Sequence, residues 1–141
     1  MGAPGYGYAA APVQPTCRIC GAHPAVDVKF RQHQGLLIAT RSMSLEGPFC
    51  RNCGTATFRE MTAKSLGQGW WSPHSMVFFN PFTIVCNLVA NAKIKKLPVP
   101  VPGQPGAQLD PGKPIRRRAV AYVPLLPLVF WAVMLAAIFL S

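Results

Sequence analysis

One five-residue pattern occurs twice in this chain. Residues 17–21 read CRICG and residues 50–54 read CRNCG, so two Cys-X-X-Cys pairs are each followed by a glycine. Such a pair in a tight turn directs both sulfurs at one ion, and the glycine supplies the positive φ that the turn needs. The repeat therefore predicts two knuckle turns around one structural Zn²⁺. Its predicted ligands are Cys17, Cys20, Cys50 and Cys53.

The segment between the two pairs has the pattern of a β-hairpin. In AVDVKFR, residues 25–31, apolar side chains alternate with charged ones, which is the period-two pattern of a half-buried strand. QHQG, residues 32–35, is the predicted turn and contains His33, and LLIATRSMSLEG, residues 36–47, is the predicted return strand. With a short helix after the second pair, residues 16–66 form a predicted zinc-ribbon domain. So small a unit needs its metal to fold.

The C-terminal segment is apolar enough to cross a membrane. Residues 119–140 contain no charged side chain and, at about 1.5 Å per helical residue, can span a hydrocarbon core of about 30 Å. Arg116, Arg117 and Arg118 directly precede this segment, and only Ser141 follows it. Because basic residues stay on the cytoplasmic side, we expect a single-pass tail anchor in the cell membrane and a cytoplasmic zinc ribbon. The formal net charge of +10 is typical of a protein beside an anionic leaflet.

Residues 67–97 combine aromatic side chains with the pattern of a helix. NPF, residues 80–82, predicts a helix start with Asn80 as N-cap, and the following residues place polar and apolar side chains on opposite faces. We therefore expect an aromatic loop followed by an amphipathic helix that lies in the membrane interface. The residues predicted at the membrane interface are Trp70 and Trp71, then Lys93, Lys95 and Lys96 at the end of this helix, then Arg116, Arg117 and Arg118.

Two alternatives remain for this uncharged middle segment. In the first, its apolar residues pack on the zinc ribbon and complete the hydrophobic core. In the second, the segment is another membrane span, which would place the ribbon outside the cell. The four cysteines would then tend toward disulfides in an oxidising compartment.

Two further segments have low-complexity compositions. Residues 1–15 are dominated by Gly, Ala, Pro and Tyr and contain no charge, so they cannot bury enough apolar surface to offset the entropy of ordering them. Residues 98–118 hold six prolines and then the arginine run, a composition that favours extended conformations. We expect a disordered tail and a semi-rigid spacer.

The cysteine pairs allow more than one class of function. As metal ligands they predict a non-catalytic binding or scaffolding module whose partners are the lipid bilayer and another protein. Thiol–disulfide exchange is the alternative, but that chemistry uses a thiolate at a helix N-terminus, usually in a βαβ fold, and neither pair has this pattern. The chain also has no Ser/His/Asp set and no phosphate-binding glycine loop, so we predict neither enzyme activity nor a small-molecule substrate.

Nucleic-acid binding is a minor alternative. Residues 16–60 carry six basic residues against three acidic ones, and a basic ribbon can contact phosphates without sequence choice. The exposed aromatic ladder that would stack bases is absent from the predicted hairpin. We therefore expect the basic residues to contact anionic lipids of a membrane and not a nucleic acid.

From Cys17 to about Pro98 the chain resembles a family of small, poorly characterised bacterial membrane proteins of the kind found in actinobacteria. The residues that carry this resemblance are the two knuckles, GQGWW at 67–71 and NPFTIVCNLVANAKIKKLP at 80–98. In the family a Gly commonly follows the Trp pair, where this chain has Ser72. The resemblance implies a four-cysteine zinc ribbon on a membrane protein, and it implies no reaction.

Overall fold

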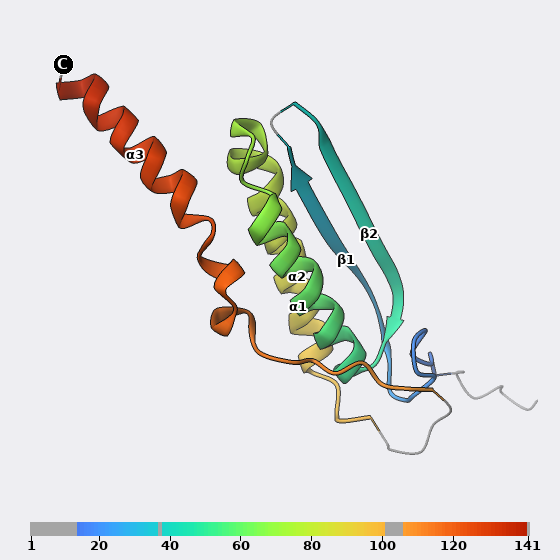
Figure 1. Ribbon diagram of the computed structural model, residues 1–141. Coiled ribbons are helices and arrows are strands. Elements are labelled where there is room, and N and C mark those ends of the chain that lie inside the picture. The colour runs from blue at the N-terminus through green and yellow to red at the C-terminus, as the bar shows by residue number, and fades with distance from the viewer. Residues whose placement is uncertain (1–13, 37, 101–105, 141) are drawn as a thin grey trace, which may run out of the picture.

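The computed structural model describes residues 14–36, 38–100 and 106–140, so most of the predicted disordered tail lies outside the described residues. A hairpin lies along two helices that pack on each other, and a third helix extends away from this body (Figure 1). The regular elements, in chain order, are β1 (Val26–Gly35), β2 (Thr40–Phe49), α1 (Arg51–Gln68), the π-helical turn η1 (Ser75–Phe79), α2 (Asn80–Lys95), the 3₁₀ turns η2 (Ile115–Arg117) and η3 (Ala119–Tyr122), and α3 (Leu125–Leu140).

The antiparallel hairpin confirms the predicted alternation of its first strand. Val28 and Phe30 are buried, and the charged residues beside them in the sequence are exposed. The predicted turn is wrong, because β1 continues through residues 32–35. His33 is therefore a strand residue, and it is buried.

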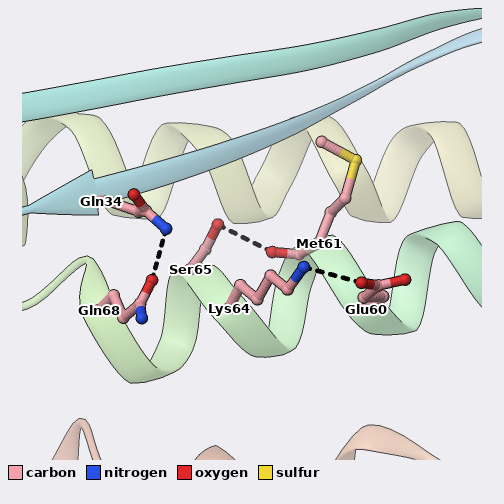
Figure 2. A network of polar contacts seen from close by, with 6 residues as sticks. All are labelled: Gln34, Glu60, Met61, Lys64, Ser65 and Gln68. Atoms are coloured by element: carbon pink, nitrogen blue, oxygen red, sulfur yellow. Dashed lines mark hydrogen bonds and ion pairs between the residues drawn. The ribbon is translucent and has the colours of Figure 1, made fainter.

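Helix α1 is longer than the short helix that the sequence predicts. It has 18 residues and begins two residues after β2 ends. It returns along the hairpin, so that its last turn lies beside the end of β1, where Gln34 Nε2 donates to Gln68 Oε1 at 2.6 Å (Figure 2). The ion pair between Lys64 and Glu60, at 2.7 Å, lies on the exposed side of α1.

A π-helical turn precedes α2 where the sequence predicts an N-cap. The helix is continuous from Ser75 to Lys95, so Asn80 lies inside it. Pro81 has no N–H to donate, and in the preceding turn the N–H of Asn80 bonds to the carbonyl of Ser75, five residues before it. The proline therefore follows one widened turn of a longer helix and does not mark its start.

The polar face of α2 covers the open edge of β1. Asn87 Oδ1 accepts a hydrogen bond from the N–H of Arg31 at 2.7 Å, and Asn87 Nδ2 donates to the carbonyl of Arg31 at 2.7 Å. His33 lies two residues after Arg31 on the same edge of β1, and its backbone N–H donates to Ser65 Oγ of α1 at 3.0 Å. Side chains thus make the bonds that a third strand would make. The buried polar residues of this helix face are Asn80, Thr83, Asn87 and Asn91.

The opposite face of α2 and its π-turn is apolar and exposed. A helix of a soluble protein normally turns its apolar stripe toward the core, and here the orientation is reversed. The interpretation in which the apolar residues of this segment complete the hydrophobic core is therefore wrong for this face, and only Ala90 and Ile94 of α2 belong to the core cluster. The side chains on this face, each about half exposed or more, are Val77, Phe78, Phe79, Phe82, Val85, Leu88 and Val89.

The described part of the predicted spacer contacts α1. Arg59 Nη1 donates to the carbonyl of Pro111 at 3.0 Å and to that of Gly112 at 2.6 Å. Nearer the start of α1, Asn52 Nδ2 donates to Gln108 Oε1 at 2.9 Å. These bonds hold the second half of this segment against the body before η2, η3 and α3 follow.

In the described part of the chain, two helices are long and apolar enough to cross a membrane. One runs from Ser75 to Lys95, and a third of its apolar window is buried in the protein. The other runs from Ala119 to Leu140 and is almost entirely exposed. The C-terminal helix that the sequence predicts is thus present, and in Figure 1 it extends away from the other elements.

Candidate metal centre

Four cysteine sulfurs converge at the end of the hairpin opposite its turn. Cys17 and Cys20 come from the N-terminal knuckle, Cys50 follows β2, and Cys53 lies in the first turn of α1. All four are buried, their sulfurs lie within 4.8 Å of one another, and Cys20 Sγ is 3.6 Å from Cys50 Sγ. Four thiolates about 2.3 Å from a tetrahedral Zn²⁺ have sulfurs about 3.8 Å apart. The cluster therefore fits one tetrahedral metal ion.

The two pentapeptides fold differently although their sequences nearly match. Gly21 has a φ of 71°, and its N–H bonds to the carbonyl of Cys17 at 2.8 Å, which closes a knuckle turn. Gly54 is helical, and its N–H bonds to the carbonyl of Cys50 at 2.9 Å. A Cβ on Gly54 would lie 2.6 Å from Cδ1 of Ile94. The prediction of a second knuckle turn is wrong, and this glycine instead allows α2 to approach α1 closely.

Burial raises the pKa of the thiols of the second pair. The pKa of Cys50 is raised to about 11, and that of Cys53 is raised as well. Burial also acts to raise the pKa of Cys17, but hydrogen bonds from the backbone around Cys20 and Cys50 outweigh it and lower this pKa to about 7. Four thiolates this close together need a compensating cation, and sulfur ligands suit Zn²⁺. The donor set thus matches a bound metal ion.

A third segment of the chain covers the cluster. The N–H of Leu109 donates to Cys53 Sγ at 3.4 Å, which stabilises a thiolate at this position. A Cβ on Gly106 would lie 2.8 Å from the carbonyl oxygen of Cys20, so the same segment passes directly over the knuckle. The spacing of the cysteines gave no indication of this contact.

The predicted interface residues lie in two groups. Trp70 and Trp71 follow α1 and line an apolar cavity of about 460 Å³ together with the first turns of α3. At the end of α2, Lys95 shares a smaller cavity of about 240 Å³ with Arg116. The structure therefore brings together basic residues from the end of α2 and from the segment before α3. The exposed residues of these basic groups are Lys93, Lys95, Lys96, Arg116 and Arg117, and Arg118 is partly buried.

No family model, curated protein or solved structure matches this chain. The resemblance to small bacterial membrane proteins therefore stays a prediction. The four clustered cysteines are compatible with a metal-binding module.

Proposed function

We propose that this protein is a membrane-anchored, non-catalytic module that holds one structural Zn²⁺. The observation that carries the proposal is the convergence of four buried sulfurs from the knuckle, the end of the hairpin and the start of α1. Four protein ligands fill a tetrahedral site and leave no open position for a substrate or water. The metal would therefore stabilise the fold and present a surface for binding or scaffolding.

The second cysteine pair has one feature of the alternative function, thiol–disulfide exchange. It lies at the N-terminus of a helix, where a thiolate is stabilised, whereas the sequence predicted that the helix would begin only after the pair. Cys50 and Cys53 are nevertheless fully buried, and burial raises the pKa of both. A thiol that is neither exposed nor readily ionised is a poor nucleophile. Cys17, whose pKa is lowered to about 7, is also buried and so has no access to a substrate disulfide, and we favour the metal site over redox chemistry.

The proposed membrane anchor is the helix from Ala119 to Leu140, with the metal module in the cytoplasm. The exposed apolar surface of this helix and the basic residues before it support a single-pass anchor. A second crossing by α2 is disfavoured because α2 packs on β1. Such a crossing would carry the charged side chains of Lys29 and Arg31 into the hydrocarbon, which is costly.

The outer edge of β2 supports the proposed role in binding another protein. Among the described residues, no strand pairs with β2 except β1. The knuckle covers only one end of this edge, where the N–H of Arg18 donates to the carbonyl of Pro48 at 2.9 Å. The remaining edge offers backbone groups to which an extended peptide of a partner could add as a strand.

The metal content of the protein tests this proposal. We would purify the full chain in mild detergent without added metal or reductant, and measure zinc and reactive thiols per chain. We expect one zinc, four protected thiols and one reactive thiol at Cys86, the only cysteine outside the cluster. Two disulfides and no zinc, in protein protected from air, would contradict the metal site and favour the redox alternative.

A further inference from the structure

A groove of about 590 Å³ lies between the exposed face of the hairpin and the start of α2. Its two walls differ in chemistry. The hairpin wall is polar and basic, with Lys29, Arg31 and Ser44. The helix wall is aromatic, with Phe78, Phe79 and Phe82. A cavity with these two walls fits a ligand that is itself amphiphilic and negatively charged.

Arg31 stands where the two walls meet. Its guanidinium carbon lies 5.7 Å from the centroid of the Phe82 ring. Its backbone N–H and its backbone carbonyl both form hydrogen bonds with the side-chain amide of Asn87. Lys29 pairs with Glu46 at 2.7 Å, whereas no carboxylate in the described chain lies within ion-pair distance of Arg31. The hydrogen bond from Lys29 lowers the pKa of the Glu46 carboxyl group, and Arg31 adds to this effect only through its charge at longer range. A guanidinium that is held against an aromatic wall and forms no direct ion pair is suited to a phosphate group.

The aromatic part of the groove lies at one end of the module. His33, which lines the groove, is joined to the first residue of the long helix through Ser75 Oγ, 3.0 Å from its Nε2. This end also carries the turn of the hairpin, where Leu36 and Ile38 are exposed, and the α1–α2 connection with the exposed Trp71 (Figure 1). The groove therefore changes from apolar near this end to basic farther from it.

We propose that this groove binds one anionic phospholipid. The acyl chains would lie on Phe78, Phe79 and Phe82, and the phosphate would bind Arg31. A second cavity of about 300 Å³ shares Lys29 and Arg31 with the groove and continues along α2 past Val85, which extends the space available to the lipid. The proposal rests on the membrane association proposed above, since the bilayer supplies the ligand, and it does not depend on the metal.

Native mass spectrometry of the full-length protein in detergent tests the site. The probes are dioleoyl phosphatidylglycerol, which is anionic, and dioleoyl phosphatidylcholine, which is zwitterionic. We expect one tightly bound phosphatidylglycerol per chain. Arg31→Gln should weaken its binding about tenfold or more, the size expected for loss of a charge-assisted hydrogen bond. The matched control is Arg41→Gln, which removes an exposed arginine of β2 outside the groove and should leave lipid binding unchanged.

Three results would overturn the lipid site. The first is equal affinity for the two lipids, and the second is an equal effect of Arg31→Gln and Arg41→Gln. The third is displacement of the lipid by glycerol 3-phosphate or by an acidic amphipathic peptide at comparable affinity, which would assign the groove to a soluble anion or to a protein.

Flotation of the same variants with phosphatidylcholine vesicles separates this inference from the proposed function. A protein that floats with the vesicles but shows no lipid binding dependent on Arg31 would contradict only the groove. A protein that does not float would contradict the membrane association itself. The melting temperature of each variant is compared with that of the unsubstituted protein, to separate a loss of lipid binding from a loss of the fold.

Discussion

The side-chain amide of Asn87 makes both backbone hydrogen bonds that a neighbouring strand would make to Arg31, each at 2.7 Å. Asn91 lies one turn later on the same buried face of α2, yet its Oδ1 is buried without a hydrogen-bond partner among the described residues. Two asparagines in similar surroundings thus differ in what they bond. They form a natural pair of test and control positions.

We predict that Asn87→Leu destabilises the protein and that Asn91→Leu does not. The first change leaves the N–H and the carbonyl of Arg31 without partners at a partly buried edge, a loss of about 2–3 kcal/mol. The second removes a buried oxygen that has no partner and adds apolar volume. Thermal unfolding in detergent measures both changes. Equal destabilisation by the two variants would show that the edge bonds contribute nothing specific.

The close contact between α1 and α2 gives a second prediction. Gly54→Ala should destabilise the protein by about 1–3 kcal/mol, because its Cβ would meet the fully buried side chain of Ile94. Adding Ile94→Val to this variant removes the nearest methyl group and should recover part of the loss. At Gly67, in the same helix, the nearest atom to an added Cβ is 3.4 Å away.

Gly67→Ala is therefore the matched control for Gly54→Ala. It should stabilise the protein by about 0.5–1 kcal/mol, since alanine favours the helix more than glycine does. The melting temperatures of the two alanine variants should move in opposite directions. If both rise, the contact with Ile94 is looser than the structure indicates.

Loss of one metal ligand should reduce both metal content and stability. Cys53→Ser removes the predicted ligand in the first turn of α1, and we expect a chain that binds less than one zinc and whose body of hairpin, α1 and α2 unfolds at a lower temperature. Membrane extraction behaviour should not change, because α3 does not depend on the cluster. Cys86→Ser serves as the control and should retain one zinc. A metal-free Cys53→Ser protein with unchanged unfolding would contradict a structural metal.

The buried His33 predicts a dependence of stability on pH. Desolvation by burial lowers the pKa of His33 below its ordinary value of 6.5. The folded protein therefore binds fewer protons here than the unfolded chain, so stability is complete above about pH 6.5 and falls as the pH decreases below it. Both ring nitrogens are held by hydroxyl groups, Nδ1 by Ser42 and Nε2 by Ser75, each at 3.0 Å.

His33→Gln should make this pH dependence shallower. The comparison uses melting temperatures of the zinc-loaded protein and the variant between about pH 7.5 and about pH 5.5. Protonation of the cysteine ligands affects both proteins alike, so the difference between the two slopes belongs to His33. Identical slopes would mean that this histidine titrates as it does in the unfolded chain.

The sequence predicted those parts of the structure that depend on local pattern. Period-two alternation placed Val28 and Phe30 in the core, and the repeated pentapeptide identified the four clustered cysteines. The turn was placed too early because Gln32 and His33 are polar, and polar residues suggest a turn. Their burial depends on partners distant in the sequence. Side chains of α1 and α2 bond the edge of β1, and the hydroxyl groups of Ser42 and Ser75 bond the imidazole, so no local pattern signals that these residues are buried.

The second pentapeptide shows why identical motifs can fold differently. At Gly21 the glycine after the cysteine pair allows the positive φ of a knuckle turn. At Gly54 the glycine in the same place of the motif leaves room for the side chain of Ile94 from the neighbouring helix. Only the helix-forming residues that follow Cys53 could have indicated that the pair begins a helix. The cover provided by Leu109 lies 56 residues from Cys53 in the sequence, and no spacing rule relates the two.

The reversed orientation of α2 gives the last prediction. Its buried asparagines and exposed apolar side chains indicate a helix whose outer face meets lipid rather than water. In a Cys86→Ser background the proposed metal should protect the remaining thiols, so that a polarity-sensitive fluorophore can be attached at one introduced cysteine. In protein reconstituted in vesicles, Leu88→Cys should give blue-shifted emission that lipid-soluble quenchers reduce. The matched position on the exposed face of α1, Glu60→Cys, should give the emission of a fluorophore in water. Equal emission at the two positions would place the outer face of α2 in water and leave α3 as the only contact with the membrane.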